Sequence, residues 1–318
     1  MHGTSFLDRL FWAGTHVAAV GLAAATLGGF LGRLWWVLDL LSHFRVQYLG
    51  AAVLLLAVYA LGKRWGWASL VAGLALLNLG LILPLFFPRQ APEMQSPAYR
   101  LFLSNVLTAN PQHERARRVI EASDADFVAL LEVSQRWLDD LNLDALGYGE
   151  RVAVPRGDNF GIALYSRYPI ADSQILYLSK WGLPAIVARV ALGGEMVTLV
   201  VVHTVPPKTG MLTRVRNAQM AALTDSPARF PHPWMIAGDF NATSWSPYFG
   251  AWLKNAGLQD SRRGFGVQPT WRGLHPLLAV PIDHVLVSDG IRVRNRRVGP
   301  DIGSDHLPVI LDFSVAGQ

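Results

Sequence analysis

Apolar positions are distributed very unevenly along the 318 residues of the chain. Three long apolar stretches come first, at residues 10–31, 46–62 and 66–87, and each approaches the roughly 20 residues that a helix needs to cross a bilayer. From residue 99 the pattern changes to short apolar runs between turn residues, which is typical of strands. We therefore predict a membrane anchor of about three transmembrane helices over residues 1–88, a linker over 89–98 and a folded domain over 99–318.

The folded domain is predicted to combine many short strands with a few helices. Strands are expected at residues 99–106, 127–132, 161–166, 186–190, 197–202, 234–237, 283–287 and 309–313. Helices are expected at residues 111–123, 135–143, 212–223 and 248–255. Short strands with interspersed helices indicate an α/β or α+β sandwich.

The N-terminal part carries further features of a membrane anchor. Trp35, Arg45 and Tyr48 are residue types that collect at the membrane interface, so residues 33–48 are expected to form a short amphipathic helix. The first apolar stretch is longer than the core of a typical signal peptide, and more apolar stretches follow it. Basic residues flank both sides of the spans about equally. A short N-terminal tail usually stays inside, and we therefore expect an extracytoplasmic folded domain.

Charge is scarce in the anchor and ordinary in the domain. The chain holds 28 basic and 23 acidic residues, of which six and three lie within residues 1–98, so residues 99–318 keep 22 and 20, a formal charge of +2. Such a small excess gives no strong support for binding duplex nucleic acid. An arginine-rich run at 292–297 fits either phosphate contacts or the solvated face of a strand. The absence of cysteine excludes disulfides and cysteine-based zinc sites.

Polar side chains stand at the ends of the predicted strands. They are Asn105, Glu132, His203, Asp239 with Asn241, Asp283, and Asp305 with His306. A carboxylate or an amide is costly to bury alone at the end of an apolar strand. Because strand ends can meet at one crevice, we expect these side chains to share a site.

The residue types in this set point to metal-assisted hydrolysis of a phosphoester. Carboxylate and amide oxygens are hard ligands that suit Mg²⁺, Mn²⁺ or Ca²⁺, and the sequence has no histidine-rich set for zinc. Two histidines beside carboxylates can transfer protons or stabilise charge on a phosphoryl group. Attack by water on a phosphate requires such a combination of metal and cationic groups.

At these motifs the chain resembles the endonuclease/exonuclease/phosphatase superfamily over about residues 99–315. The most specific segments are Gly238–Asp239–Phe240–Asn241 and Ser304–Asp305–His306–Leu307–Pro308, which occur in the order typical of the family. Segments at 161–170, 216–219 and 269–271 are similar in a less specific way. The resemblance implies a four-layered α/β sandwich with two central mixed β-sheets, here preceded by an α-helical transmembrane anchor.

The resemblance also implies a metal site. Glu132 would be the principal ligand, with Asn105 nearby and Asp305 as a further ligand. The cofactor would be Mg²⁺, with Mn²⁺ and Ca²⁺ as alternatives. Abasic-site endonucleases tend to carry a carboxylate two residues after the first asparagine, where this chain has Leu107, which argues against close kinship with that branch.

The remaining residues of the set receive catalytic roles from the same resemblance. His306 would act on the attacking water or the phosphate, oriented by Asp283. Asp239 would orient or deprotonate the water. Asn241 and His203 would hold the phosphoryl oxygens and stabilise their charge. His284, next to Asp283, is interpreted as structural or peripheral.

Together these features predict a membrane-anchored metal-dependent phosphoesterase, integral to a bacterial inner or plasma membrane. Its partners would be the bilayer, through the N-terminal segment, and a phosphoester substrate, either a lipid headgroup or a nucleic acid. A nuclease acting on DNA or RNA is the first alternative, and an inactive membrane-tethered binding module is the second. The specificity is expected to lie in loops at 173–184, 205–214 and 260–281.

Overall fold

The computed structural model describes residues 5–88, 98–224, 230–273 and 275–315. Within it the chain forms two compact units. One contains the N-terminal helices up to Pro84 together with Trp245–Tyr248, and the other contains the rest of the chain. Of the linker predicted at 89–98, all but Ala98 lies outside the described residues.

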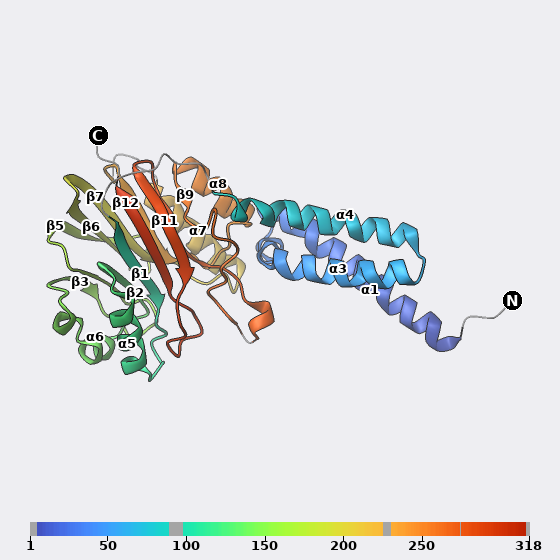
Figure 1. The fold of residues 1–318 in the computed structure, drawn as a ribbon, viewed down its shortest axis with the longest axis horizontal. Coiled ribbons are helices and arrows are strands. Elements are labelled where there is room, and N and C mark those ends of the chain that lie inside the picture. The colour runs from blue at the N-terminus through green and yellow to red at the C-terminus, as the bar shows by residue number, and fades with distance from the viewer. Residues whose placement is uncertain (1–4, 89–97, 225–229, 274, 316–318) are drawn as a thin grey trace. The chain divides into compact units, whose positions relative to one another are not determined.

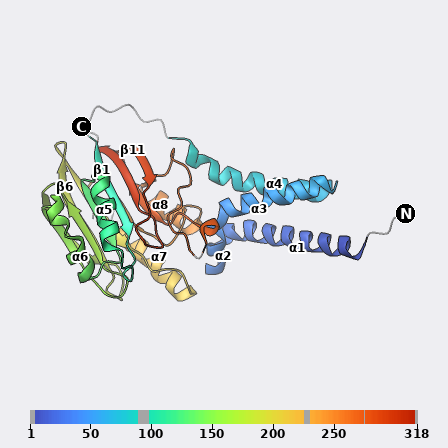
Figure 2. The same ribbon diagram turned by 60° about the horizontal axis from the view of Figure 1, so that its bottom comes forward.

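The N-terminal unit is helical throughout most of its length. It contains α1 (Phe6–Gly28), α2 (Trp36–Leu41), α3 (Arg45–Leu61) and α4 (Trp65–Ile82). Short 3₁₀ turns join α1 to α2 and α2 to α3, and a tight turn joins α3 to α4. The three long helices lie side by side in Figures 1 and 2. Their sequences supply three candidate membrane spans, Phe6–Leu31, Trp36–Leu61 and Trp65–Phe86. The second is longer than the apolar stretch predicts, because the segment expected as a separate amphipathic helix is itself largely helical.

Polar residues inside this unit bond between helices. The His16 Nδ1 atom lies 2.9 Å from the Tyr59 hydroxyl, and the His16 ring stacks on Trp67. The buried Asn78 amide donates to the Thr26 hydroxyl at 3.2 Å, and the Arg45 guanidinium donates to the Thr26 carbonyl at 2.7 Å. In an apolar setting such bonds fix how helices pack, so these side chains have a structural explanation.

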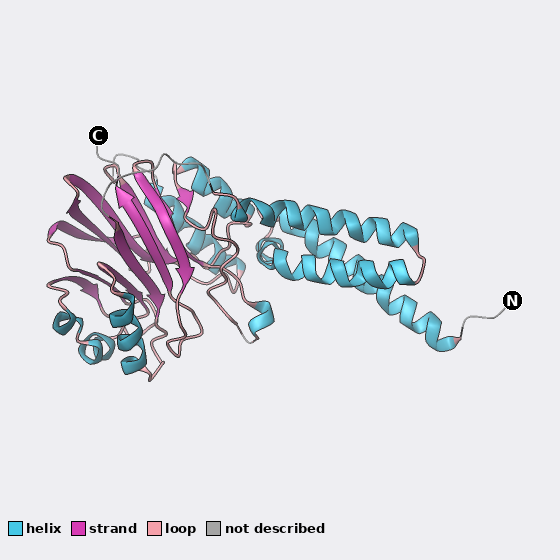
Figure 3. Ribbon diagram, viewed as in Figure 1, coloured by secondary structure: helices cyan, strands magenta, loops and turns pink. Residues whose placement is uncertain are grey.

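The second unit contains two six-stranded mixed sheets (Figure 3). The first has the order β11-β12-β1-β2-β4-β3. Its strands are β1 (Tyr99–Asn105), β2 (Phe127–Leu131), β3 (Glu150–Val154), β4 (Ile162–Ser166), β11 (Ile291–Val298) and β12 (Val309–Val315). The second has the order β5-β6-β7-β8-β10-β9. Its strands are β5 (Ile170–Tyr177), β6 (Pro184–Leu192), β7 (Glu195–His203), β8 (Trp234–Asp239), β9 (Gln259–Asp260) and β10 (Asp283–Val287).

Successive side chains of a strand point to opposite faces of its sheet, so each sheet packs against the other sheet on one face and against helices on the other. This arrangement gives four layers. In β1, Leu101 and Leu103 enter the core between the two sheets, whereas Phe102 packs in a second core with α5 (His113–Ser123) and α6 (Gln135–Leu141). The helices α7 (Gly210–Thr224) and α8 (Pro247–Asn255) belong to the second sheet's side of the domain. The structure therefore confirms the predicted fold class, two mixed sheets with flanking helices.

The arginine-rich run at 292–297 is not a uniformly solvated strand face. It forms β11, in which the pairing with β12 shifts between Val293 and Asn295. Because of this shift Arg294 is exposed, whereas Arg296 is buried and donates to the Asp283 carbonyl at 3.2 Å. The run is therefore only partly a solvated strand face.

Candidate active site

The predicted site residues of the second sheet stand in one line across its edge. His203 ends β7 and pairs with Asp239 at the end of β8, and Asp239 pairs with Asp283 at the start of β10. In the first sheet the C-terminal ends of β1 and β2 are also neighbours, with Asn105 paired to Leu131 and Glu132 next in the chain. Strand pairing thus places five of the predicted residues at or next to the ends of neighbouring strands, three in the second sheet and two in the first.

The Asn105 side-chain amide connects the two sheets at the site. The Asn105 Nδ2 atom donates to Glu132 Oε1 at 2.9 Å and lies 3.4 Å from Asp239 Oδ2. The Asn105 Oδ1 atom accepts from the Leu107 backbone N–H at 3.1 Å, so both ends of the amide are bonded. Residues 134 positions apart in the chain therefore meet in one buried network.

Glu132 is held in an unusual backbone conformation. Its φ of 63° lies in the left-handed region, which costs free energy for a residue with a side chain and is often found at functional sites. The Thr108 hydroxyl donates to the Glu132 carbonyl at 2.8 Å, and the Thr108 N–H approaches Glu132 Oε2 at 3.4 Å. Thr108 therefore stabilises both the backbone and the carboxylate.

Asp239 lies at the centre of the network. Its Oδ1 atom accepts from the Asn241 N–H at 2.8 Å. Its Oδ2 atom lies 3.4 Å from His203 Nε2 and 3.8 Å from His306 Nε2. The preceding Gly238 is required because a Cβ atom there would come within 2.1 Å of the Val202 carbonyl oxygen on β7. The glycine of the motif thus allows the strand contact that brings Asp239 between two histidines.

His306 and Asp283 form a tightly bonded pair. His306 Nδ1 lies 2.8 Å from Asp283 Oδ2, and both side chains are buried. Burial opposes a charge on His306, but the Asp283 carboxylate outweighs it and raises the pKa of His306 to about 10. Burial likewise opposes a charge on His203, yet the hydrogen bond and charge of Asp239 raise the pKa of that imidazole. Both histidines are thereby favoured as cations beside carboxylates.

Asn241 and Asp305 occupy less central positions. The Asn241 amide donates to the Thr204 carbonyl at 2.9 Å, so its contribution to the network is the backbone N–H that holds Asp239. Asp305 is exposed, and its carboxylate accepts from Trp271 Nε1 at 3.2 Å. The structure therefore places Asp305 at the rim of the site, next to His306.

The donor set fits a divalent cation. Glu132 and Asp239 are buried carboxylates, and among the described residues neither forms an ion pair with a lysine or an arginine. Asp239 lies beside two histidines, whereas Glu132 forms no ion pair among the described residues. A buried carboxylate without a cationic partner is unfavourable, and a hard cation would balance Glu132. Asp239, Asp283 and His306 also offer ligand atoms within 4.8 Å of one another. However, Asp283 Oδ2 already bonds His306 Nδ1 at 2.8 Å, whereas Glu132 has no cationic partner among the described residues, so Glu132 with Asn105 is the better ligand set.

Several positioning residues have no role in the sequence interpretation. The buried Gln219 on α7 accepts from the Val205 N–H at 2.9 Å and approaches the His203 carbonyl at 3.4 Å, and Arg216 donates to the Asn241 carbonyl at 3.1 Å. The Thr270 hydroxyl accepts from the Asp283 N–H at 3.2 Å, and the Ser304 hydroxyl donates to the Asn105 carbonyl at 2.8 Å. In the sequence, these residues are marked only by lying in segments that resemble the family.

A second buried charged cluster lies behind β10 and has a structural explanation. The Arg262 guanidinium donates to Asp260 Oδ2 at 2.9 Å. Burial would raise the pKa of Asp260, but the Arg262 charge holds it well below its ordinary value. Burial lowers the pKa of His284 to about 4, and His284 Nε2 lies 2.8 Å from the Ala242 carbonyl oxygen. His284 is therefore a neutral core residue and not part of the network around Asp239.

Known proteins share both the sequence pattern and the fold. The sequence model of the endonuclease/exonuclease/phosphatase family matches residues 99–306, about two thirds of the chain. The chain belongs to this family. Members of the family are divalent-metal-dependent phosphoesterases and nucleases, in accordance with the acidic cluster at this site.

Individual relatives are distant. A UPF0294 protein of Vibrio cholerae serotype O1 is 28% identical over 188 residues, which cover 56% of this chain and 63% of that protein. The endonuclease/exonuclease/phosphatase from Beutenbergia cavernae has a TM-score of 0.58 at 22% identity, covering 69% of this chain and 72% of that chain. The human Nocturnin catalytic domain with bound sulfate has a TM-score of 0.56 at 20% identity, covering 70% and 96%. These two similarities support the fold.

Proposed function

We propose that this chain is a membrane-anchored, divalent-metal-dependent phosphoesterase that hydrolyses a phosphodiester or a phosphomonoester by in-line attack of water. The observation that carries the proposal is the convergence of strand ends from both sheets on one network. Its members are Asn105, Glu132, His203, Asp239, Asp283 and His306. An inactive binding module has no need of such a complete and buried set.

Glu132 and Asn105 would hold Mg²⁺ or Mn²⁺, with Asp305 contributing from the rim. When bound, the cation supplies positive charge that polarises the phosphoryl group and compensates the carboxylates. Asn105 would have to turn its amide oxygen toward the ion, because its nitrogen now points at Glu132. The positioning of Glu132 by Thr108 is already in place.

The proton chemistry falls to Asp239 and the two histidines. Asp239 would orient the attacking water and accept its proton, because its Oδ1 atom is held by the Asn241 N–H while its Oδ2 atom faces two imidazoles. His306, kept charged by Asp283, would donate to a phosphoryl oxygen, and His203 would do the same from the other side. Asn241 would assist there if its amide leaves the Thr204 carbonyl.

Metal removal tests the function directly. The full chain in detergent micelles is expected to hydrolyse at least one member of a phosphoester panel with Mg²⁺ or Mn²⁺, and to lose that activity in EDTA. The panel holds bis(p-nitrophenyl) phosphate, single- and double-stranded DNA, RNA and phospholipid vesicles. Cleavage of nucleic acid alone would favour the nuclease alternative. No cleavage together with no metal binding would favour the inactive module.

The side of the membrane follows from the anchor. Three spans would place the catalytic domain opposite the N-terminus, and the short N-terminal tail with Arg9 is expected inside, so we propose an extracytoplasmic domain. Because the chain has no cysteine, Arg118→Cys on α5 introduces a single thiol. A membrane-impermeant maleimide should label it in intact cells or spheroplasts. Labelling only after lysis would place the domain inside and contradict the proposal.

A further inference from the structure

The catalytic domain exposes few large apolar side chains, and they are not scattered. Among the described residues beyond position 99, the large apolar side chains that are more than a third exposed are Tyr177, Trp181, Met211, Leu277 and Leu278. We call this set the apolar rim. Leu277 is 76% and Met211 is 55% exposed, values that core packing does not explain. An apolar surface that is concentrated in a few loops usually marks an interaction site.

Strand register places the loops of the apolar rim at the catalytic edge. Tyr177 ends β5 opposite Pro184 at the start of β6, and the next residue, Ala185, pairs with Val202 beside His203. Trp181 lies in the turn between these strands. Met211 is on the first turn of α7, soon after β7 ends at His203, and Leu277 and Leu278 lie in the loop that leads into Asp283. All three loops therefore leave the sheet where the proposed catalytic residues stand.

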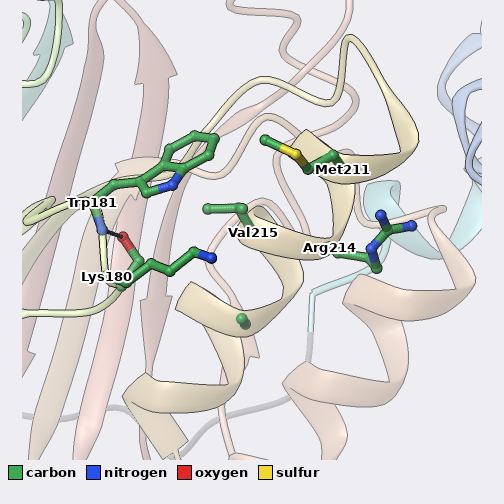
Figure 4. A pocket seen from close by; sticks show the side chains of 7 residues that line it. Lys180, Trp181, Met211, Arg214 and Val215 are labelled. Atoms are coloured by element: carbon green, nitrogen blue, oxygen red, sulfur yellow. Dashed lines mark hydrogen bonds between the residues drawn. The ribbon is translucent and has the colours of Figure 1, made fainter.

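The loop between β5 and β6 and the helix α7 line a pocket of about 580 Å³. In Figure 4 the Trp181 ring and the side chains of Met211 and Val215 face one another across it. The other face of α7 carries the buried Arg216 and Gln219, which position the backbone around Asn241 and His203. One helix thus forms the pocket wall on one side and supports the catalytic site on the other.

Positive charge accompanies the apolar side chains. Lys180 and Arg214 line the same pocket, and Lys208 lies between β7 and α7. All three are exposed, and within the described part of the chain none forms an ion pair. By contrast, several arginines elsewhere in the domain form ion pairs, for example Arg100 with Asp312. Exposed apolar groups beside unpaired cations suit the surface of a lipid bilayer, which has anionic headgroups over an apolar interior.

We propose that the apolar rim docks on an anionic lipid bilayer, with Trp181, Met211 and Leu277 entering the headgroup region, and that the scissile phosphoester belongs to a membrane lipid. This inference rests on the proposed phosphoesterase function and names its substrate class. Tryptophan with basic residues is the composition that settles at a membrane interface. The formal charge of +2 on residues 99–318 provides little for a nucleic acid backbone, whereas the candidate spans would keep this domain at a bilayer.

Docking can be measured without any turnover. The full chain has no cysteine, so Met211→Cys and Leu277→Cys each create one site for an environment-sensitive fluorophore. Arg136→Cys on α6, which covers the outer face of the first sheet, is the matched control. In liposomes of phosphatidylcholine and phosphatidylglycerol, a nitroxide-labelled lipid should quench the labels at 211 and 277 at least about twofold more than the label at 136. Equal quenching at the three positions would overturn the proposal.

The charge contribution has its own control. Arg214→Glu and Lys180→Glu should reduce quenching at position 277, and this reduction should shrink in high salt, where charges are screened. Arg118→Glu on α5 should leave the quenching unchanged. Docking on an anionic surface would be contradicted if quenching at position 277 changes neither with the charges of Lys180 and Arg214 nor with the charge of the lipid.

The substrate class is tested by a ratio of two activities. In proteoliposomes, the combined change Trp181→Ser and Met211→Ser should lower hydrolysis of phospholipid relative to soluble bis(p-nitrophenyl) phosphate by roughly tenfold, because apolar contacts are lost only with the lipid. Trp181→Phe should largely restore the ratio. An unchanged ratio, or a preference of the unaltered protein for single-stranded DNA, would overturn the assignment. If the protein hydrolyses no soluble bis(p-nitrophenyl) phosphate at all, this result counts against the proposed function. The quenching experiment alone then decides whether the apolar rim docks on the bilayer.

Discussion

Glu132→Gln is expected to reduce kcat/KM for metal-dependent phosphoester hydrolysis by at least about 10²- to 10³-fold. The change keeps the size of the side chain but removes the negative charge that would hold the cation. The Asn105 amide, which donates to Glu132 Oε1 at 2.9 Å, retains an acceptor in the variant, so the fold should persist. The measurement is kcat/KM for bis(p-nitrophenyl) phosphate over a series of Mn²⁺ concentrations, with circular dichroism as a check on folding.

The matched control for this variant is Glu114→Gln. Glu114 lies in the first turn of α5 and is exposed, with an ion pair to Arg118 at 3.4 Å. Exposed pairs of this kind contribute little, so activity and Mn²⁺ dependence should stay as in the unaltered protein. Retained turnover in Glu132→Gln with unchanged Mn²⁺ dependence would refute the assignment of Glu132 as the principal ligand.

Asp283→Asn is expected to lower activity by roughly 10²-fold or more at pH 8 and by less at pH 6. The Asp283 carboxylate opposes the effect of burial and raises the pKa of His306 to about 10, so His306 is charged throughout this range in the unaltered protein. Without that charge the pKa should fall to roughly 6.5 or below. His306 would then be neutral at pH 8 and partly charged at pH 6.

The ratio of variant to unaltered activity should therefore rise as the pH falls from 8 to 6. Taking the ratio removes the titration of groups that both proteins share. Asp289→Asn, just beyond the far end of β10, is the control, because Asp289 is exposed and bonds Gln259 at 3.2 Å. A ratio that is constant with pH would show that Asp283 does not act through the charge of His306.

The central strands could be predicted from the sequence because they are buried on both faces. β2, β8 and β10 are buried along their whole length, and their apolar runs are continuous. The edge strands β3 and β5 give no such signal. In β5, residues Asp172, Ser173 and Gln174 are all exposed, so neither a continuous run nor a clear alternation marks the strand.

The candidate site shows the same division. The sequence predicts that polar residues at strand ends share one crevice, and the register pairs His203 with Asp239 and Asp239 with Asp283. What each side chain bonds could not be predicted. The Asn241 amide donates to the Thr204 carbonyl, and Asp305 faces Trp271, since those directions depend on contacts between residues distant in the sequence.

The contribution of α7 to the site could not be predicted from the sequence either. Periodicity predicts a helix at 212–223, and the structure has α7 at Gly210–Thr224. The pattern does not show that Arg216 and Gln219 are buried, because long polar side chains usually face solvent. Their partners are backbone groups of Asn241, Val205 and His203, which carry no residue-type signal.

The most direct test of the account uses water labelled with ¹⁸O. The full chain would hydrolyse bis(p-nitrophenyl) phosphate with Mn²⁺ in this water, and both products would be analysed by mass spectrometry. Attack of water at phosphorus predicts one ¹⁸O atom in the p-nitrophenyl phosphate and none in the p-nitrophenol. It also predicts no reaction in EDTA and at least about 10²-fold slower label incorporation with Glu132→Gln. Label in the p-nitrophenol, or turnover that survives EDTA, would contradict metal-assisted hydrolysis at this site.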